Sequence, residues 1–278
     1  MHNQYIFLDV DGTLVTYENM LPLSAVKAIK EAQNNGHKIY TVTGRSKAEM
    51  YEEILSVGFD GYIGGNGSYI ESQNTVVSEK TLSYTDCKAI VDWLHAKKLE
   101  FYLESNQALI GSEQFERKAE KTIQLYSARK GKSKSESIKV KDVFPEMIFE
   151  KNLYRSDVNK ISFLLSNYND YLEAKSYFSH LNVNTWGGGG ETALFGDIAL
   201  DNIDKGTAIK ELMSYLDQTG NNTFAFGDAK VDIPMLEYCQ VGISMGNGGV
   251  EIKEIADYIT DDVTEDGLYK AFKFFKLI

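Results

Sequence analysis

The chain has 278 residues, of which 43% are hydrophobic and three are proline, so it can bury a full core and is more consistent with two domains than one. Its formal net charge of −11 gives little electrostatic support to a nucleic-acid or anionic-membrane partner. No segment is long and apolar enough to span a bilayer, and the N-terminal stretch lacks the basic start and cleavage site of a signal peptide. We therefore expect a cytoplasmic protein.

Predicted strands and helices alternate in the first part of the chain. The order is strand 5–8, helix 23–36, strand 37–45, helix 46–58 and strand 59–71. Ser24 is the expected N-cap of the first helix, and Ser46 with Glu49 has the spacing of a capping box at the start of the second. This alternation predicts a parallel sheet with right-handed crossovers.

The pattern changes from about residue 83 and returns near residue 199. The middle block predicts a hairpin at 99–111, a helix at 112–131, a strand at 159–167 and a helix at 170–181. The last block predicts a helix at 204–220, a strand at 223–229, a helix at 232–239 and a strand at 241–245. We infer a doubly wound, Rossmann-like α/β core made of residues 1–82 and 199–278, interrupted by an α+β domain at 83–198.

A basic run at residues 129–141 lies inside this middle block. It lacks interleaved aromatic residues, and the whole chain is acidic. We therefore expect a solvated loop there and no nucleic-acid partner.

Polar side chains fall where predicted core strands end or where a core helix begins. They are Asp9, Asp11, Thr43, Lys205, Asp228 and Asp232. Each has a local explanation, such as an Asp-Gly turn, the β-propensity of threonine or helix capping. In a doubly wound sheet, however, all of these loops can open on one crevice.

Several carboxylates in one crevice would repel one another unless they shared a cation. Oxygen ligands without a histidine or cysteine cluster favour Mg²⁺, which commonly shares phosphate oxygens with its protein ligands. A lysine and a hydroxyl beside the ion would complete a site for phosphoryl transfer, with one aspartate able to serve as the nucleophile.

The segments "DVDGTL", "TVTGR", "DKGTAI" and "GDAKVD", in this order, resemble the four motifs of the haloacid dehalogenase superfamily. The middle block is similar in position to the α/β cap, of the C2 type, in the Cof-type (class IIB) phosphatases of that superfamily. "GGNGSYI" and the C-terminal segment that begins "ISMGNGG" are also similar to that subfamily. The resemblance covers essentially the whole core. It implies a Mg²⁺-dependent phosphomonoester hydrolase that works through an aspartyl-phosphate.

The resemblance also implies a role for each polar residue. Asp9 corresponds to the nucleophile, and Asp11 to the general acid that protonates the leaving alcohol and then activates water. Thr43 and Lys205 correspond to the groups that hold the phosphoryl oxygens. The implied Mg²⁺ ligands are Asp9, the backbone carbonyl of Asp11 and Asp228, with Asp232 supporting the ion from the same loop as Asp228.

One position departs from the family pattern. The last motif usually reads G-D-x-x-N-D, and Val231 stands at the asparagine position. Two alternatives to hydrolysis therefore stay open: a phosphomutase of the same superfamily, and a non-catalytic protein that binds a phosphorylated ligand. A receiver domain is excluded by chain length and motif order, and a dinucleotide-binding enzyme has only weak support because no glycine-rich segment has the required context.

The expected substrate is a small phosphorylated metabolite, with sugar phosphates favoured, because a cap that closes over the crevice would accommodate a macromolecule poorly. We expect a monomer or a weak dimer, with no membrane partner.

Overall fold

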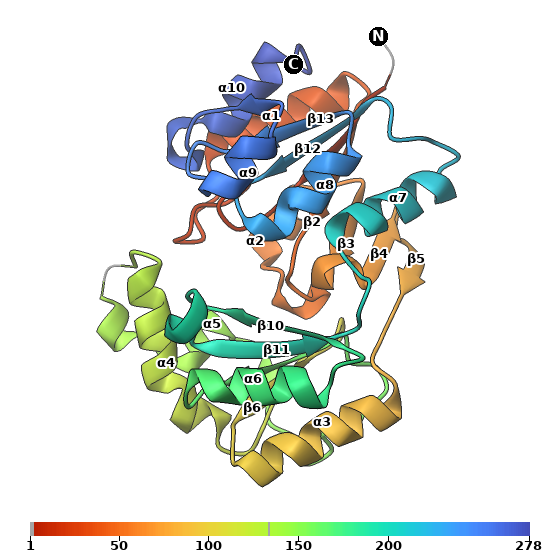
Figure 1. Ribbon diagram of the computed structural model, residues 1–278. Helices are drawn as coiled ribbons and strands as arrows, with labels where there is room; N and C mark the ends of the chain where they lie inside the picture. The colour runs from red at the N-terminus through yellow and green to blue at the C-terminus, as the bar shows by residue number, and fades with distance from the viewer. Residues whose placement is uncertain (1–2, 133) are drawn as a thin grey trace. The chain divides into compact units, whose positions relative to one another are not determined.

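A computed structural model describes residues 3–132 and 134–278. It divides into two compact units (Figure 1). The core unit consists of the N-terminal segment up to Arg45, then Met50–Glu79 and Ile203–Ile278. The insert unit consists of Ser46–Glu49 and Lys80–Asn202. The insert predicted from the sequence was 83–198, whereas this unit also includes Ser46–Glu49.

The core unit is built on a sheet that has eight strands in the described part of the chain. In sheet order they are β14 (Tyr258–Ile259), β13 (Val241–Ser244), β12 (Thr223–Gly227), β1 (Tyr5–Leu8), β2 (Lys38–Val42), β3 (Gly61–Gly64), β4 (Tyr69–Ser72) and β5 (Thr75–Glu79). All pairs from β14 to β3 are parallel, and β4 and β5 add an antiparallel edge. Since the chain leaves β1 toward β2 and returns to β12 on its other side, β1 lies where the strand order reverses.

Helices cover both faces of this sheet. The core helices are α1 (Leu23–Asn34), α2 (Glu52–Leu55), α7 (Lys205–Tyr215), α8 (Ile233–Tyr238), α9 (Val250–Ile255) and α10 (Gly267–Phe274), with short 3-10 helices η2 (Gly65–Gly67), η5 (Lys230–Asp232) and η6 (Val263–Glu265). Ile6 and Leu8 belong to the apolar cluster that includes α1 and α10, whereas Phe7 belongs to the cluster that includes α7 and α8. This alternation along β1 explains why the strand is apolar at every position.

The insert unit has its own sheet, with six strands in the residues that the structure describes. In sheet order they are β10 (Asn182–Trp186), β11 (Phe195–Ala199), β9 (Lys160–Leu164), β6 (Phe101–Glu104), β7 (Leu109–Gly111) and β8 (Met147–Ile148). Its helices are α3 (Tyr84–Lys97), α4 (Phe115–Arg129), α5 (Val140–Val143) and α6 (Tyr168–Tyr177), with 3-10 helices η1 (Lys47–Glu49), η3 (Ser135–Ser137) and η4 (Gly190–Thr192). Two apolar clusters, one including α3 and α6 and the other α4 and α5, form its interior.

The predicted fold class is confirmed, but two local predictions need correction. Ser24 is not an N-cap: α1 begins at Leu23 after Pro22, and the Ser24 hydroxyl donates to Asp266 (2.6 Å). At Ser46 the backbone N–H donates to the Glu49 carboxylate (2.7 Å), as in a capping box, but the Ser46 hydroxyl donates to the same carboxylate instead of accepting. The predicted helix at 46–58 is accordingly interrupted, with η1 followed by α2.

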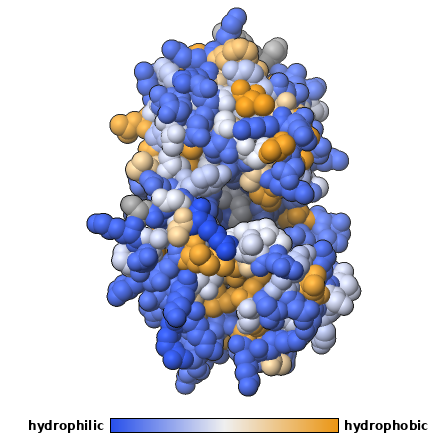
Figure 2. Space-filling view, turned by 60° about the vertical axis from the view of Figure 1, so that its left-hand side comes forward, coloured by the Kyte–Doolittle hydropathy of each residue, from blue (hydrophilic) through white to orange (hydrophobic). Residues whose placement is uncertain are grey.

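Hydrophilic residues cover most of the molecular face shown in Figure 2, with apolar side chains in patches between them. Most described residues of the basic run at 129–141 are exposed or half-buried, but Val140 is buried. The run is not a single loop as predicted, because Arg129 ends α4, Ser135–Ser137 form η3 and α5 begins at Val140. Ser133 lies outside the described residues. Among the described residues, no helix is both long enough and apolar enough to cross a membrane.

Candidate active site

Three buried aspartates meet in the core unit. Asp9 follows β1, Asp228 follows β12, and Asp232 ends η5. Their exposed fractions are 6%, 3% and 0%, and one carboxylate oxygen of each lies within 4.8 Å of the others. Parallel pairing explains the meeting, because β1 is flanked by β12 and all parallel strands end at the same edge of the sheet.

Lys205 joins two of these aspartates. It is the first residue of α7, and its ammonium donates to Asp9 Oδ1 (2.6 Å) and to Asp232 Oδ1 (2.5 Å) while the side chain is only 1% exposed. The helix start is fixed by Asp204, whose carboxylate accepts from the backbone N–H of Thr207 (2.7 Å). The buried lysine is thus held by the cap of its own helix and by two carboxylates.

Charge in this cluster is unbalanced. Burial raises the pKa of Asp9 well above its ordinary value, the charge of Asp232 raises it further, and Lys205 lowers it. Burial would lower the pKa of Lys205, but Asp232 and Asp9 together raise it, so the ammonium keeps its proton at neutral pH. Three carboxylates therefore face one ammonium, and a bound cation would offset the excess negative charge. An all-oxygen donor set of this kind fits Mg²⁺.

The Asp-Gly sequence after β1 makes room for Asp228. Gly12 has φ +91°, and a Cβ on it would lie 2.4 Å from Asp228 Oδ2, so a larger residue would collide with the carboxylate. The Tyr17 hydroxyl donates to the same oxygen, and the Thr13 hydroxyl donates to Oδ1 (3.4 Å). Burial and the charge of Asp228 raise the pKa of Tyr17, which keeps the phenol a donor.

Asp232 organises the loop that carries Asp228. Its Oδ2 accepts from the backbone N–H groups of Asp228 (3.1 Å) and Ala229 (3.0 Å), while Oδ1 accepts from Lys205. Both of its oxygens are therefore already engaged by the chain. This geometry suits a carboxylate that supports a metal ligand from the same loop.

The Asp11 carboxylate pairs with Arg45, whereas the Asp9 carboxylate pairs with Lys205. Its two carboxylate oxygens accept from Arg45 Nε (2.9 Å) and Nη2 (2.7 Å). The cluster of carboxylates found among the described residues consists of the other three aspartates and does not include the Asp11 side chain. Arg45 is the main residue that the sequence analysis missed, although it belongs to the segment "TVTGR" used there.

Thr43 follows β2 and is 1% exposed. Its hydroxyl oxygen accepts from the backbone N–H of Arg45 (3.2 Å), which leaves the hydroxyl proton available to an incoming acceptor. The Gly-Asn-Gly turn fixes this segment, because the N–H of Asn66 donates to the Thr43 carbonyl (3.0 Å) and the N–H of Gly65 donates to the Arg45 carbonyl (2.8 Å).

Two further residues near the acidic cluster had no strong sequence signal. Tyr17 lies in the loop after the Asp-Gly turn, and Asn247 lies in the glycine-rich segment after β13. The Asn247 amide donates to the Gly12 carbonyl (2.8 Å), and its oxygen accepts from the N–H of Val263 (3.0 Å). Tyr17 binds a carboxylate of the cluster and Asn247 binds the backbone beside it. Both contacts join residues far apart in the sequence, so no local pattern predicts them.

Val231 is 48% exposed in η5, so it is not part of the core. Its neighbour Asp232 is fully buried. The departure from the family motif is thus at a solvent-facing position beside the cluster.

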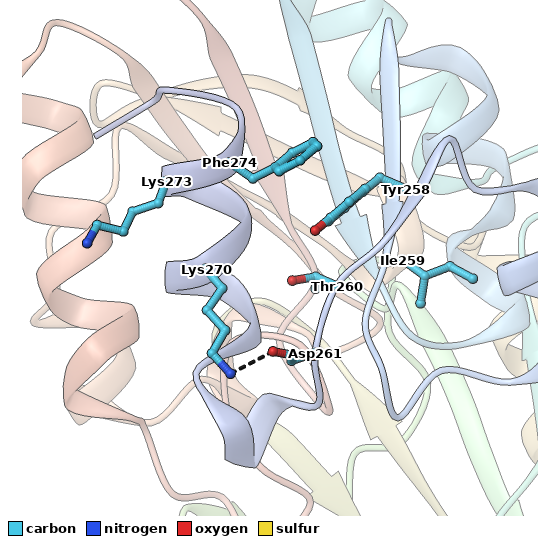
Figure 3. Close-up of a pocket in the computed structure, with 7 residues that line it drawn as sticks. All are labelled: Tyr258, Ile259, Thr260, Asp261, Lys270, Lys273 and Phe274. Carbon is cyan, nitrogen blue, oxygen red and sulfur yellow. Dashed lines mark hydrogen bonds and ion pairs between the residues drawn. The ribbon is translucent and has the colours of Figure 1, made fainter.

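A surface pocket lies in another part of the core unit, beside β14 and α10 (Figure 3). An ion pair between Lys270 and Asp261 (2.6 Å) and stacked rings of Tyr258 and Phe274 form much of its wall. Both charged residues are about half exposed, and none of the three buried aspartates lines the pocket. We therefore place the candidate active site at the acidic cluster.

The chain is similar to known proteins over most of its length. Residues 6–272 match a family described as haloacid dehalogenase-like hydrolase. The chain is 27% identical over 282 residues to the "Putative phosphatase YkrA" of Bacillus subtilis (strain 168), which covers 98% of each chain. It is 26% identical to the "5-amino-6-(5-phospho-D-ribitylamino)uracil phosphatase YcsE" of the same organism, covering 96% of this chain and 94% of the relative.

A solved structure shows the same fold. The subclass IIB sugar phosphatase BT4131 superposes with a TM-score of 0.77 at 23% identity, covering 99% of this chain and all of the other.

Proposed function

The chain belongs to the haloacid dehalogenase-like hydrolases and is a phosphatase of that family, and from this premise we propose that it hydrolyses small phosphate monoesters through an aspartyl-phosphate on Asp9. The observation that carries the proposal is the buried cluster of Asp9, Asp228 and Asp232 with Lys205 bound between two of them. The cluster lies where the strand order of the sheet reverses, which is where open α/β sheets bind ligands.

In the first step, a carboxylate oxygen of Asp9 attacks phosphorus and the bond from phosphorus to the ester oxygen breaks. The electron pair of that bond goes to the ester oxygen, which takes a proton from Asp11 and leaves as the alcohol. Lys205 and the Thr43 hydroxyl would donate to the equatorial phosphoryl oxygens. The positive charge of Lys205 and the hydrogen bonds from both groups would stabilise the negative charge on those oxygens as the transition state forms.

In the second step, water attacks the phosphorus of the aspartyl-phosphate. Asp11, now a carboxylate, takes the proton from that water, and the bond from phosphorus to Asp9 breaks. Inorganic phosphate leaves and Asp9 is regenerated. The two aspartates that follow β1 therefore have separate roles, one in attack and one in proton transfer.

Asp9, Asp228 and the backbone carbonyl of Asp11 would hold Mg²⁺, whose charge would offset the repulsion between these carboxylates and the substrate phosphate. Asp232 would keep Asp228 in place through the loop hydrogen bonds described above.

We favour sugar phosphates and related small metabolites as substrates. A relative with 26% identity is named for a phosphate ester of a ribityl compound, and the subclass IIB neighbour is a sugar phosphatase. We assign the insert unit the role of a cap that selects the leaving group. Its support is that the insert has its own sheet and apolar clusters and interrupts the chain of the core.

The test is phosphate release from a panel of phosphorylated metabolites and from para-nitrophenyl phosphate, with Mg²⁺ or with excess EDTA. We expect turnover with Mg²⁺, loss of turnover with EDTA, partial replacement by Mn²⁺ or Co²⁺, and inhibition by Ca²⁺, whose looser coordination would let Asp9 bind the ion with both oxygens. Full activity in EDTA would refute the metal requirement. Transfer of phosphate to a second sugar position would instead show a phosphomutase, and binding without turnover would show a regulatory protein.

A further inference from the structure

The Asp11 carboxylate is held by a two-point contact with Arg45. The Nε and Nη2 atoms of the guanidinium donate to the two different oxygens, at 2.9 and 2.7 Å. Such a fork fixes the plane of a carboxylate as well as its position, which a single hydrogen bond does not. The side chains of Asp11 and Arg45 are 29% and 15% exposed, so the pair is partly shielded from water.

Arg45 is itself fixed by neighbours on several sides. Its Nη2 also donates to Asn19 Oδ1 (3.2 Å), and its guanidinium lies over the ring of Tyr51, 4.8 Å from the centroid. The Asn19 amide donates in turn to the Tyr51 hydroxyl (3.4 Å). The Arg45 carbonyl accepts from the Tyr62 hydroxyl (2.6 Å). The residue that holds Asp11 is thus anchored by both its side chain and its backbone.

The same residue connects two groups of the proposed mechanism. The backbone N–H of Arg45 donates to the hydroxyl of Thr43, while its side chain holds Asp11. A segment of three residues after β2 therefore fixes both a group assigned to the phosphoryl oxygens and the group assigned to the leaving oxygen.

We propose that Arg45 is a positioning residue that holds Asp11 in the orientation from which it protonates the leaving group. This inference rests on the hydrolytic function proposed above. Without the fork, the Asp11 side chain gains rotational freedom and spends less time in the productive geometry. In this proposal Arg45 acts on the reaction through Asp11, to which both its Nε and its Nη2 donate.

The leaving group of the substrate provides the test. An alkyl phosphate releases a strongly basic alkoxide and needs a proton from Asp11, whereas para-nitrophenyl phosphate releases a phenolate that leaves without one. We therefore compare R45M with the wild-type protein in single turnovers with enzyme in excess, measuring release of the alcohol or phenol. This readout isolates the first step from hydrolysis of the aspartyl-phosphate.

We expect R45M to slow release from the alkyl phosphate by about 10- to 100-fold and release from para-nitrophenyl phosphate by less than about threefold. R45K keeps the charge but cannot form the fork, so it should behave like R45M. In a D11N background, R45M should have no further effect on the alkyl phosphate. Mg²⁺ binding and Tm, measured on each variant, identify any that fail to fold.

Three results would overturn the proposal: equal slowing with both esters, full recovery of the alkyl-phosphate rate in R45K, or an undiminished effect of R45M in the D11N background. If R45M does not fold, R45K with the same two esters decides the question. Failure of the proposed function is distinguishable, since the wild-type protein would then release neither leaving group, or D9N would release both at the wild-type rate.

Discussion

The core unit and the insert unit both bury charged side chains, but they place them differently. In the core, Asp9 follows β1 and Asp232 ends η5, and both carboxylates accept from Lys205 at the start of α7. In the insert, Glu104 ends β6 and Lys160 begins β9, and the two residues are directly opposite each other in the register, with Glu104 Oε2 3.0 Å from Lys160 Nζ.

The two clusters also differ in how excess negative charge can be removed. Burial raises the pKa of Glu104 to about 8, so this carboxyl can take up a proton, and the Ser162 hydroxyl donates to its other oxygen (2.6 Å). In the core cluster, Lys205 pairs with Asp9 and Asp232, and Asp228 adds a third carboxylate with an oxygen within 4.8 Å of oxygens of the other two. The two clusters therefore differ in their pairing: Glu104 and Lys160 face each other across adjacent strands, whereas the core aspartates lie in the segments that follow β1 and β12 and in η5.

The largest expected effects are at the two aspartates after β1. D9N should abolish turnover of every ester, because an amide is a poor nucleophile and a weaker metal ligand. D11N should retain the nucleophile and lose proton transfer, with a fall in kcat of about 10²–10⁴-fold on alkyl phosphates. Steady-state kinetics on both variants check this difference. Equal, complete inactivation with every leaving group would argue against separate roles.

Removal of the insert tests whether the core unit alone carries the metal site and whether the insert unit controls turnover of the substrate. Replacing residues 83–198 with a short linker should leave a core that still binds Mg²⁺ but turns over its best substrate at least about tenfold more slowly, because the chain would lose the cap role proposed for the insert. Calorimetry for Mg²⁺ and the substrate profile of the truncated chain are the measurements. A folded core with an unchanged substrate profile would show that specificity lies outside the insert.

The core site was predictable because its residues lie where elements end. Asp9, Thr43 and Asp228 each follow an apolar run, so parallel pairing of β1, β2 and β12 brings their loops to one edge. Lys205 opens an apolar helix, but the strand before it belongs to the insert sheet, so its position depends on the packing of α7. Many core strands and helices follow from the same apolar periodicity, including α8 with Pro234 early in it. The sequence analysis did not predict β5, α9, β14 or α10, and the strand predicted at 59–71 is two antiparallel strands, β3 and β4, with η2 between them.

The remaining contacts depend on tertiary structure. Glu104 and Lys160 are 56 positions apart and meet only through the register of β6 and β9, which no local pattern specifies. The fork between Arg45 and Asp11 and the hydrogen bond from Tyr17 to Asp228 likewise join different loops. Ser24 was misassigned because a serine near a helix start is a common N-cap, yet here it lies inside the first turn.

A smaller effect is expected at the position that departs from the family motif. V231N adds a donor beside the acidic loop and should raise kcat on a generic phosphate ester severalfold, with unchanged Mg²⁺ affinity. Since Val231 is 48% exposed, Tm should stay within about 1 °C of wild type. A slower and less stable variant would show that the valine has a packing role.

The pH dependence of stability should reveal the raised pKa of Glu104 in the insert unit. The raised pKa of Glu104, about 8 against an ordinary 4.5, means that the folded chain keeps a proton that the unfolded chain has lost between these two values. This contribution to stability is complete below pH 4.5 and is lost as the pH rises through 8. E104Q should remove the loss, so wild-type Tm should fall by about 5 °C more than that of E104Q between pH 5 and 8. If the Tm of the wild type and of E104Q changed equally with pH, the raised pKa of Glu104 would be contradicted.

The proposed mechanism depends on phosphorylation of Asp9. The direct measurement is acid quenching of the enzyme during turnover of a labelled phosphate ester, followed by proteolysis and identification of the labelled peptide by mass spectrometry. We expect label on the peptide that contains Asp9, sensitivity of that label to hydroxylamine, and its absence in D9N. Label on a peptide without Asp9, or turnover by D9N at the wild-type rate, would contradict it.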